Sequence, residues 1–328
     1  MDLPTVAQIL PLHERWFVDS RPAGDWSFFF SPLPLLLTAA VVAVTVAWRL
    51  VALRVDRPEL SVLSPLGRLV PWVPRLLGIH LGVALLALAA TGSFMTPANA
   101  HLDGVGGHAL LLAEAALGIW LVTGYRLRYA AALVLALGPA LASVAGWTAL
   151  GECANLAAVA AFLVVVPPGA DAYGATHPST VDLRRALFVL RLGVGAALIV
   201  LAFTEKLTNP AMAVDTLHRF PALDVFGLVG IHLAPETFVA IAGATELLFG
   251  LLVISGAFPQ VAVLVAMVPF NATLLLFGQT EMVGHLPVYG VFLALMVYGS
   301  NAETAALVRW LPRIRAPRAV HRSVPETT

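Results

Sequence analysis

The sequence is poor in charged residues. Only 12% of its 328 residues are Asp, Glu, Lys or Arg, whereas 59% are hydrophobic, and the mean hydropathy is +0.87. A soluble protein carries about 25% charged residues, so this composition indicates an all-α protein that crosses a membrane several times. The formal net charge is zero, and no overall field favours binding to nucleic acid.

Cysteine and lysine are almost absent as well. Cys153 is the one cysteine, which excludes a disulfide or a CxxC redox pair within this chain. Lys206 is the one lysine among nineteen basic residues, a bias that suggests a GC-rich bacterial genome. The sequence has no Walker loop, no GxGxxG in a βαβ context, no HExxH and no nucleophile elbow. These absences argue against the nucleotide and hydrolase chemistry of soluble enzymes.

Nine apolar stretches follow an N-terminal segment, 1–31, in which aromatic and charged residues alternate. This segment is expected either at the headgroup level of the membrane or as a partly ordered tail. Two of the stretches are short for a span of about 20 residues. The nine lie near 33–53, 72–92, 107–124, 129–148, 153–167, 186–204, 237–256, 259–278 and 285–300.

Nine spans place nearly all the arginines on one side of the membrane. The positive-inside rule then predicts that the N-terminus is outside and the C-terminus in the cytoplasm, and we expect the inner membrane of a bacterial cell. The arginines on the predicted inner side are Arg54, Arg57, Arg68, Arg126, Arg128, Arg184, Arg185, Arg309, Arg313, Arg315, Arg318 and Arg322.

A pattern of glutamate and glycine occurs twice at a constant interval of 132 residues, which predicts an internal duplication. The matched pairs are Glu114 and Glu246, Gly118 and Gly250, Gly124 and Gly256, and Gly146 and Gly278. Because each copy has four spans, both copies point the same way. The predicted organisation is a leading helix (32–54), a first four-helix repeat (72–167), a second four-helix repeat (184–300) and a basic cytoplasmic tail (301–328). The outer loop of the second copy, 205–236, is longer than its counterpart and is expected to contain a short helix or re-entrant piece around 210–220.

The second copy resembles the DoxX family of bacterial membrane proteins, including its DoxD-like relatives. The matching runs are RLGVGAALIVLAFTEKLTNP, which begins at Arg191, and ELLFGLLVISG, which begins at Glu246. The first copy keeps Arg75 and the Glu114 helix but departs from the pattern at 91–97. The resemblance implies a four-helix unit associated with quinone-linked oxidoreductases, thiosulfate oxidation or redox homeostasis. Because many members of the family have no established activity, the resemblance does not imply one reaction.

Glu246 is the first candidate for a functional side chain, because a carboxylate at membrane depth needs a partner or a role. One interpretation is a catalytic group that relays a proton or hydrogen-bonds a polar head group. The other is structural pairing with Arg191 or with a backbone group of a neighbouring helix. Glu114 has the same two interpretations, and its presence in the less complete copy favours the structural one.

Glu205 and Lys206 lie at the outer end of the sixth stretch. They either frame the mouth of a cavity and take part in catalysis, or extend to the interface as snorkelling side chains. Arg191, at the inner end of the same stretch, either belongs to a ligand site or contacts a lipid phosphate. Asn271 lies in the middle of a span and is either an interhelical hydrogen-bonding group or a ligand contact.

Most histidines fall on the predicted outer side. They favour either a metal, a heme or proton exchange at that face, or simply polar residues at the interface. His285 is the best placed of them, because it begins the ninth stretch and corresponds to Cys153 at the interval of 132. The outer histidines are His13, His101, His108, His218, His232 and His285.

Three functions remain open from the sequence. The first is a membrane subunit of a redox system that binds a quinone or similar lipid-soluble ligand in the second repeat. It would need no cofactor within the chain, and its electrons would come from a partner protein. The second is a non-catalytic membrane scaffold or assembly factor for a partner protein. The third, less favoured, is a small-solute transporter, since no broken helix pair supports it.

Overall fold

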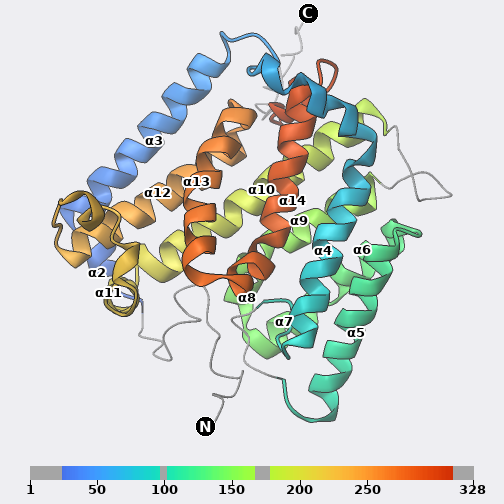
Figure 1. Ribbon diagram of the computed structural model, residues 1–328, viewed down its shortest axis with the longest axis horizontal. Helices are drawn as coiled ribbons and strands as arrows, with labels where there is room; N and C mark the ends of the chain where they lie inside the picture. The colour runs from blue at the N-terminus through green and yellow to red at the C-terminus, as the bar shows by residue number, and fades with distance from the viewer. Residues whose placement is uncertain (1–23, 97–101, 167–177, 313–328) are drawn as a thin grey trace, which may run out of the picture.

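The computed structural model describes residues 24–96, 102–166 and 178–312, and every regular element in these ranges is a helix (Figure 1). The all-α prediction is therefore confirmed for the described part of the chain. Seven helices there are long and apolar enough to cross a membrane, as expected of a multi-pass membrane protein. Two shorter apolar helices, Ala154–Val165 and Pro259–Leu275, coincide with the two remaining predicted stretches. The count of nine spans stays a prediction.

The elements follow one another in the order of the predicted halves. The leading part is α2 (Trp26–Phe29), α3 (Pro32–Ala52) and the 3-10 helix η2 (Ser61–Trp72). The first half is α4 (Val73–Ala90), α5 (Gly104–Thr123), α6 (Leu127–Ala136), α7 (Gly138–Ala145), α8 (Trp147–Glu152) and α9 (Ala154–Val165). The second half is α10 (Thr180–Leu201), the π-helix η3 (Ala202–Leu207), α11 (Pro210–Arg219), η4 (Pro221–Leu223), η5 (Gly227–Val229), α12 (Pro235–Ser255), α13 (Pro259–Phe277), α14 (Gln279–Ser300) and α15 (Ala305–Val308).

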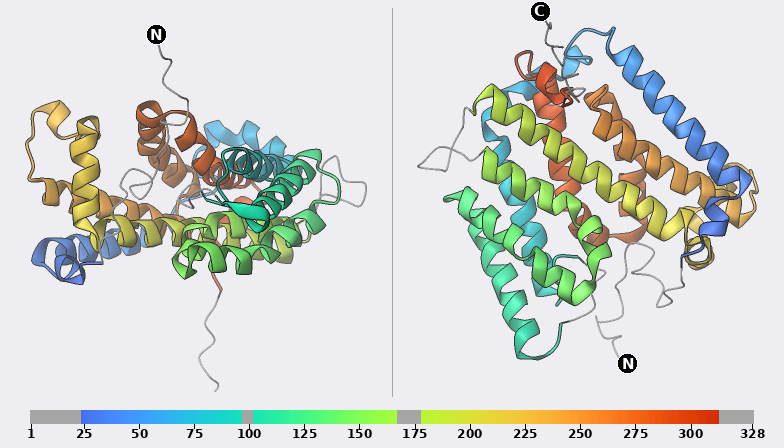
Figure 2. Two further views of the ribbon diagram at one scale, coloured as in Figure 1. Left: turned by 90° about the horizontal axis from the view of Figure 1, so that it is seen from below. Right: turned by 180° about the vertical axis from the view of Figure 1, so that it is seen from behind.

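Helix starts and ends follow local sequence signals. The hydroxyl of Ser179 caps α10 by accepting a hydrogen bond from the backbone N–H of Asp182 at 3.1 Å. Proline stands in the first turn of α3, α4, α12 and α13, where its missing N–H costs nothing. The expected short helix in the long outer loop is α11, which Figure 2 shows standing out from the main layer of helices (gold, left panel).

The two halves share three unusual backbone positions at the interval of 132. A left-handed glycine ends α5 and α12, a left-handed non-glycine residue precedes α6 and α13, and a glycine with positive φ precedes α8 and α14. The pairs are Gly124 (φ 81°) and Gly256 (φ 63°), Arg126 (φ 46°) and Phe258 (φ 45°), and Gly146 (φ 83°) and Gly278 (φ 71°). Because such positions are rare outside glycine, their recurrence at one spacing supports the predicted duplication.

The helices of the two halves interleave at the centre of the molecule. The helix of the first predicted span of each half packs on that of the second span of its own half, α4 on α5 and α10 on α12. The helix of the fourth predicted span, however, packs mainly on that of the first span of the other half, α9 on α10 and α14 on α4 (Figure 1). One continuous hydrophobic core therefore runs through both halves, and the described helices do not form two separate bundles.

Buried arginines fasten helix ends at the arginine-rich end of the molecule. Arg191 is fully buried and donates hydrogen bonds to the carbonyls of Ile254, at 3.1 Å, and Trp310. Arg75 in the first half donates in the same way to the carbonyls of Leu121, at 3.3 Å, and Val122, at 2.5 Å. The carbonyls of Ile254, Leu121 and Val122 belong to the last turns of α12 and α5, where most helix carbonyls lack intrahelical partners. Arg191 is thus a structural clamp here, and the alternative pairing of Glu246 with Arg191 is wrong.

We expect replacement of Arg191 by methionine to lower the free energy of unfolding by about 2–3 kcal/mol. The substitution removes the arginine donor from two part-buried carbonyls, and an unsatisfied buried group costs about 1–3 kcal/mol. The matched control is Arg185→Met, which removes an exposed arginine from the same helix. Urea unfolding in detergent micelles measures the free energy of unfolding of both variants. Equal losses in the two variants would contradict the structural role of Arg191.

The beginning of the predicted tail is part of the folded structure. Arg309 is 2% exposed, forms an ion pair with Glu59 at 3.2 Å and donates to the carbonyl of Ala52 at 2.6 Å. Arg49 donates to the carbonyls of Ser255, at 2.9 Å, and Arg309, at 3.1 Å. The segment around α15 is therefore tied to α3 and α12. The rest of the predicted tail, 313–328, and most of the predicted N-terminal segment lie outside the described residues.

Candidate functional site

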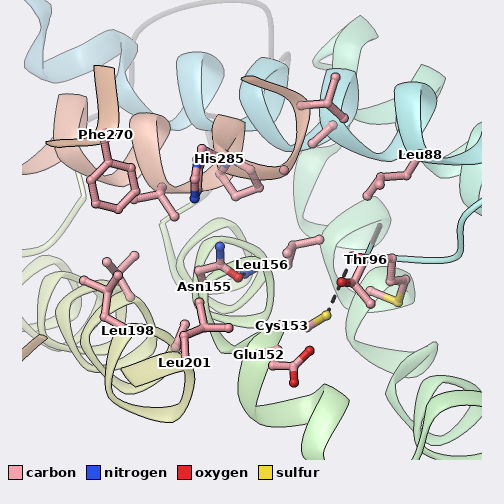
Figure 3. A pocket seen from close by; sticks show the side chains of 18 of the residues that line it. Leu88, Thr96, Glu152, Cys153, Asn155, Leu156, Leu198, Leu201, Phe270 and His285 are labelled. Atoms are coloured by element: carbon pink, nitrogen blue, oxygen red, sulfur yellow. Dashed lines mark hydrogen bonds between the residues drawn. The ribbon is translucent and has the colours of Figure 1, made fainter. Parts of the chain in front are cut away.

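A small cavity lies where the interleaved helices of the two halves meet (Figure 3). Its volume is about 60 Å³, which is room for about two water molecules at liquid density. Most of its lining is apolar, with side chains from α4, α10 and α13. Its polar lining residues are Thr96, Glu152, Cys153, Asn155, Glu246 and His285. We call this the central cavity.

Residues at corresponding positions of the two halves line the central cavity. Cys153 and His285, which stand 132 positions apart, both line it, as the sequence interval had paired them. The first long helix of each half, α4 and α10, also contributes two lining residues at one common interval. Ala197 follows Ala84, and Leu201 follows Leu88, by 113 positions. The cavity therefore belongs to both halves and is not enclosed by the second half alone.

Glu246, Lys206 and Glu205 form a charge cluster beside the cavity. The ammonium of Lys206 lies 3.2 Å from Oε2 of Glu246 and 3.9 Å from Oε2 of Glu205. Glu205 is 1% exposed, whereas Lys206 and Glu246 are 18% and 20% exposed. Lys206 and Glu205 sit on the π-helix η3, a local distortion that is frequent at functional sites. The structure thus brings together the three residues that the sequence had proposed as catalytic, although only Glu246 lines the cavity.

His285 is held in place by aromatic rings. It is 9% exposed, and its ring meets Phe270 edge to face at a centroid distance of 4.8 Å and Tyr289 at 6.4 Å. Figure 3 shows its imidazole and the amide of Asn155 directed toward one another across the cavity. His285 therefore presents its polar imidazole to the central cavity. This position agrees with its candidacy as a ligand contact.

Asn155 and Glu152 are polar lining residues that the sequence did not single out. The Oδ1 atom of Asn155 accepts a hydrogen bond from the backbone N–H of Leu156 at 2.8 Å, which directs the amide NH₂ group away from its own helix. Glu152 ends α8, one residue before the break at Cys153 between α8 and α9. The pairing of Cys153 with His285 by the repeat interval was the signal that could have pointed to both residues.

Three other candidate residues lie outside the central cavity. Glu114 is fully buried in α5 and accepts a hydrogen bond from the backbone N–H of Met95 at 3.0 Å. Since Met95 lines the cavity, Glu114 acts on the site only by fixing the loop after α4. Asn271 lies exposed on α13 and donates to the carbonyl of Met267 at 2.7 Å, and Arg191 is the clamp described above.

The remaining outer histidines do not gather into a site within the described ranges. His108, His218 and His232 are exposed, and His13 and His101 lie outside the described residues. The described part of the chain contains no group of three or more His, Cys, Asp or Glu side chains that could hold a metal ion. The described histidines therefore give no support to the metal interpretation.

No family model, no curated protein and no solved structure matches this chain. The resemblance to the DoxX family therefore rests on the two sequence runs that begin at Arg191 and Glu246. The candidate site rests on the geometry of the central cavity.

Proposed function

We propose that the protein is a membrane subunit of a redox system that binds the polar head of a quinone or similar lipid-soluble ligand in the central cavity. The observation that carries the proposal is the convergence of His285 and Asn155, from opposite halves, on a cavity with apolar walls. Ligand pockets are typically apolar with a few convergent polar groups. We place the ligand between the halves, because the lining residues come from both.

The polar groups suit a ligand that carries two separated oxygen atoms. A quinone offers two carbonyl oxygens and takes up two electrons and two protons on reduction. The amide of Asn155 and an imidazole N–H of His285 can each donate a hydrogen bond to one oxygen. Glu246, which lines the cavity and is paired with Lys206, is positioned to give or take a proton. Electrons would come from a partner protein.

The small volume of the cavity sets a condition on this function. Pockets for small organic ligands usually measure about 300–1,000 Å³, whereas this one measures about 60 Å³. Binding of a whole quinone ring therefore requires the helices that line the cavity to separate. The same observation favours the second candidate, a non-catalytic scaffold in which the polar residues hold the two halves together and a few water molecules fill the cavity.

The arrangement of the helix ends supports the proposed topology. The end of α3, the start of α4, the α5–α6 and α12–α13 turns and the end of α14 all lie toward one end of the molecule (Figure 1). These are the segments where most of the described arginines cluster. We infer nine spans in a leading helix and two parallel repeats, with this end in the cytoplasm of a bacterial cell.

Titration of the purified protein with a short-chain quinone tests the proposed function. We expect saturable binding at one site per chain, and about tenfold weaker binding after Asn155→Leu, because the substitution removes one hydrogen-bond donor. His285→Phe should weaken binding by a similar factor. Intrinsic tryptophan fluorescence or calorimetry measures the affinity.

Asn271→Leu is the matched control for Asn155→Leu. It removes the same amide from an exposed face of α13 that does not line the cavity, so binding should be unchanged. No saturable quinone binding by the wild type, together with a partner protein that co-purifies in fixed proportion, would overturn the proposal and support the scaffold.

A further inference from the structure

A second hollow lies at the arginine-rich end of the molecule, far along α4 and α14 from the central cavity. It has a volume of about 460 Å³ and is formed by η2, by the end of α14 and by the residues that follow it. Its polar lining consists of Ser61, Ser64 and Arg68 from η2, together with Ser300 and Asn301. The proposed function makes no use of these residues.

The side chains of η2 fall into three sets. Leu63, Leu66 and Val70 pack against the hydrophobic core. Val62, Leu69 and Trp72 are apolar and are exposed by 80%, 38% and 43%. The polar residues at positions 61, 64 and 68 line the hollow. Thus η2 combines exposed apolar side chains with polar residues that line a hollow, a composition suited to the membrane interface.

The hollow is chemically suited to an anion. Arg68, Ser61 and Ser64 are exposed, and their side chains make no hydrogen bond or ion pair with another described residue. No carboxylate is among the lining residues. Of the nearby acids, Glu59 is already paired with Arg309, and Glu303 is exposed outside the hollow. One guanidinium and two hydroxyl donors are therefore available to phosphate oxygens.

We propose that this hollow binds the phosphate group of an anionic phospholipid, whose acyl chains contact the exposed side chains of Val62, Leu69 and Trp72. Arg68 contacts the phosphate and the hydroxyls of Ser61 and Ser64 donate to its remaining oxygens or to the head group. The exposed apolar side chains distinguish a lipid from a free phosphate ion, which offers nothing to cover them. The site depends on neither the quinone nor the central cavity.

Native mass spectrometry of the full-length protein in detergent tests the proposal, with phosphatidylglycerol as the probe. We expect retained phosphatidylglycerol at low lipid excess and about fivefold weaker binding for Arg68→Gln, the usual effect of one basic residue at an anionic surface. The double variant Ser61→Ala/Ser64→Ala should also weaken binding, although it leaves the net charge unchanged. The matched control Arg54→Gln removes an exposed arginine at the same end that does not line the hollow, and it should bind as the wild type does.

Two further arms identify the source of the phosphate. Inorganic phosphate at millimolar concentration should not displace phosphatidylglycerol, and phosphatidylcholine should bind at least fivefold more weakly. Displacement by inorganic phosphate would overturn the lipid assignment in favour of a soluble anion. Equal losses of phosphatidylglycerol binding in Arg54→Gln and Arg68→Gln would show that the hollow is not the lipid site. Binding of phosphatidylcholine as tight as that of phosphatidylglycerol would also overturn the proposal.

Discussion

Replacement of Lys206 by methionine is expected to lower the free energy of unfolding by about 2–3 kcal/mol. The ammonium of Lys206 lies 3.2 Å from Glu246 and 3.9 Å from Glu205, and all three side chains are largely buried. Without Lys206, the carboxylate of Glu246 loses the cation at 3.2 Å and that of Glu205 loses the cation at 3.9 Å. Removal of one partner of a buried ion pair is strongly destabilising, because the other charge is left uncompensated. Thermal or urea unfolding in micelles measures the loss.

A double-mutant cycle separates the ion pair from other effects of the substitution. The variant Lys206→Met/Glu246→Gln removes both charges of the 3.2 Å pair and should lose at least 1 kcal/mol less than the sum of the two single variants. Lys206→Arg keeps the charge and should stay near the wild type in stability. Additive single effects would contradict the pairing of Lys206 with Glu246.

Replacement of Gly195 by alanine is expected to cost about 2–3 kcal/mol of stability, the second large effect. A Cβ atom at Gly195 would lie 2.6 Å from the carbonyl oxygen of Gly250 and 2.3 Å from Cγ1 of Ile254. Real Cβ atoms do not approach a backbone oxygen so closely, so α10 and α12 would have to separate. Forcing extra volume into a packed interface typically costs about 1–3 kcal/mol. Since η3 follows α10 directly, the same shift should also loosen the contact between Lys206 and Glu246.

The control for this substitution is Gly106→Ala in α5. A Cβ atom at Gly106 meets nothing within 4 Å, and alanine favours a helix over glycine by about 1 kcal/mol. Gly106→Ala should therefore be neutral or slightly stabilising under the same conditions. If Gly195→Ala proved as well tolerated as Gly106→Ala, the close approach of α10 and α12 would be contradicted. The first half repeats this contact between Gly82 and Gly118, so Gly82→Ala should behave like Gly195→Ala.

Much of the fold was predictable because the membrane restricts the choices. Long apolar stretches must form helices in lipid, and the helix ends coincide with glycines and prolines visible in the sequence. The interval of 132 matched glycines that later proved to share positive φ, Gly124 with Gly256 and Gly146 with Gly278. The sequence could not show that α9 packs on α10 and α14 on α4, each across the two halves. This pairing depends on tertiary packing.

The same limit explains which site residues the sequence missed. Glu246 stood out because charged residues are rare at membrane depth, and Glu205 and Lys206 because they lie at the outer end of the sixth stretch; the structure brings the three together. Asn155 and Glu152 lie in the first half, and only the interleaving of the helices brings them near His285. Arg191 stood out because it begins the run that resembles the DoxX family and lies at the inner end of the sixth stretch, yet its partners are backbone carbonyls, and no sequence pattern marks such carbonyls in advance.

The most direct test of the central claim, a ligand site built jointly by the two halves, is the quinone titration of the wild type beside Asn155→Leu and His285→Phe. Our interpretation predicts one saturable site per chain, with weaker binding when either half loses its polar residue. Loss of binding in His285→Phe with unchanged affinity in Asn155→Leu would contradict the shared site and confine the ligand to the second half.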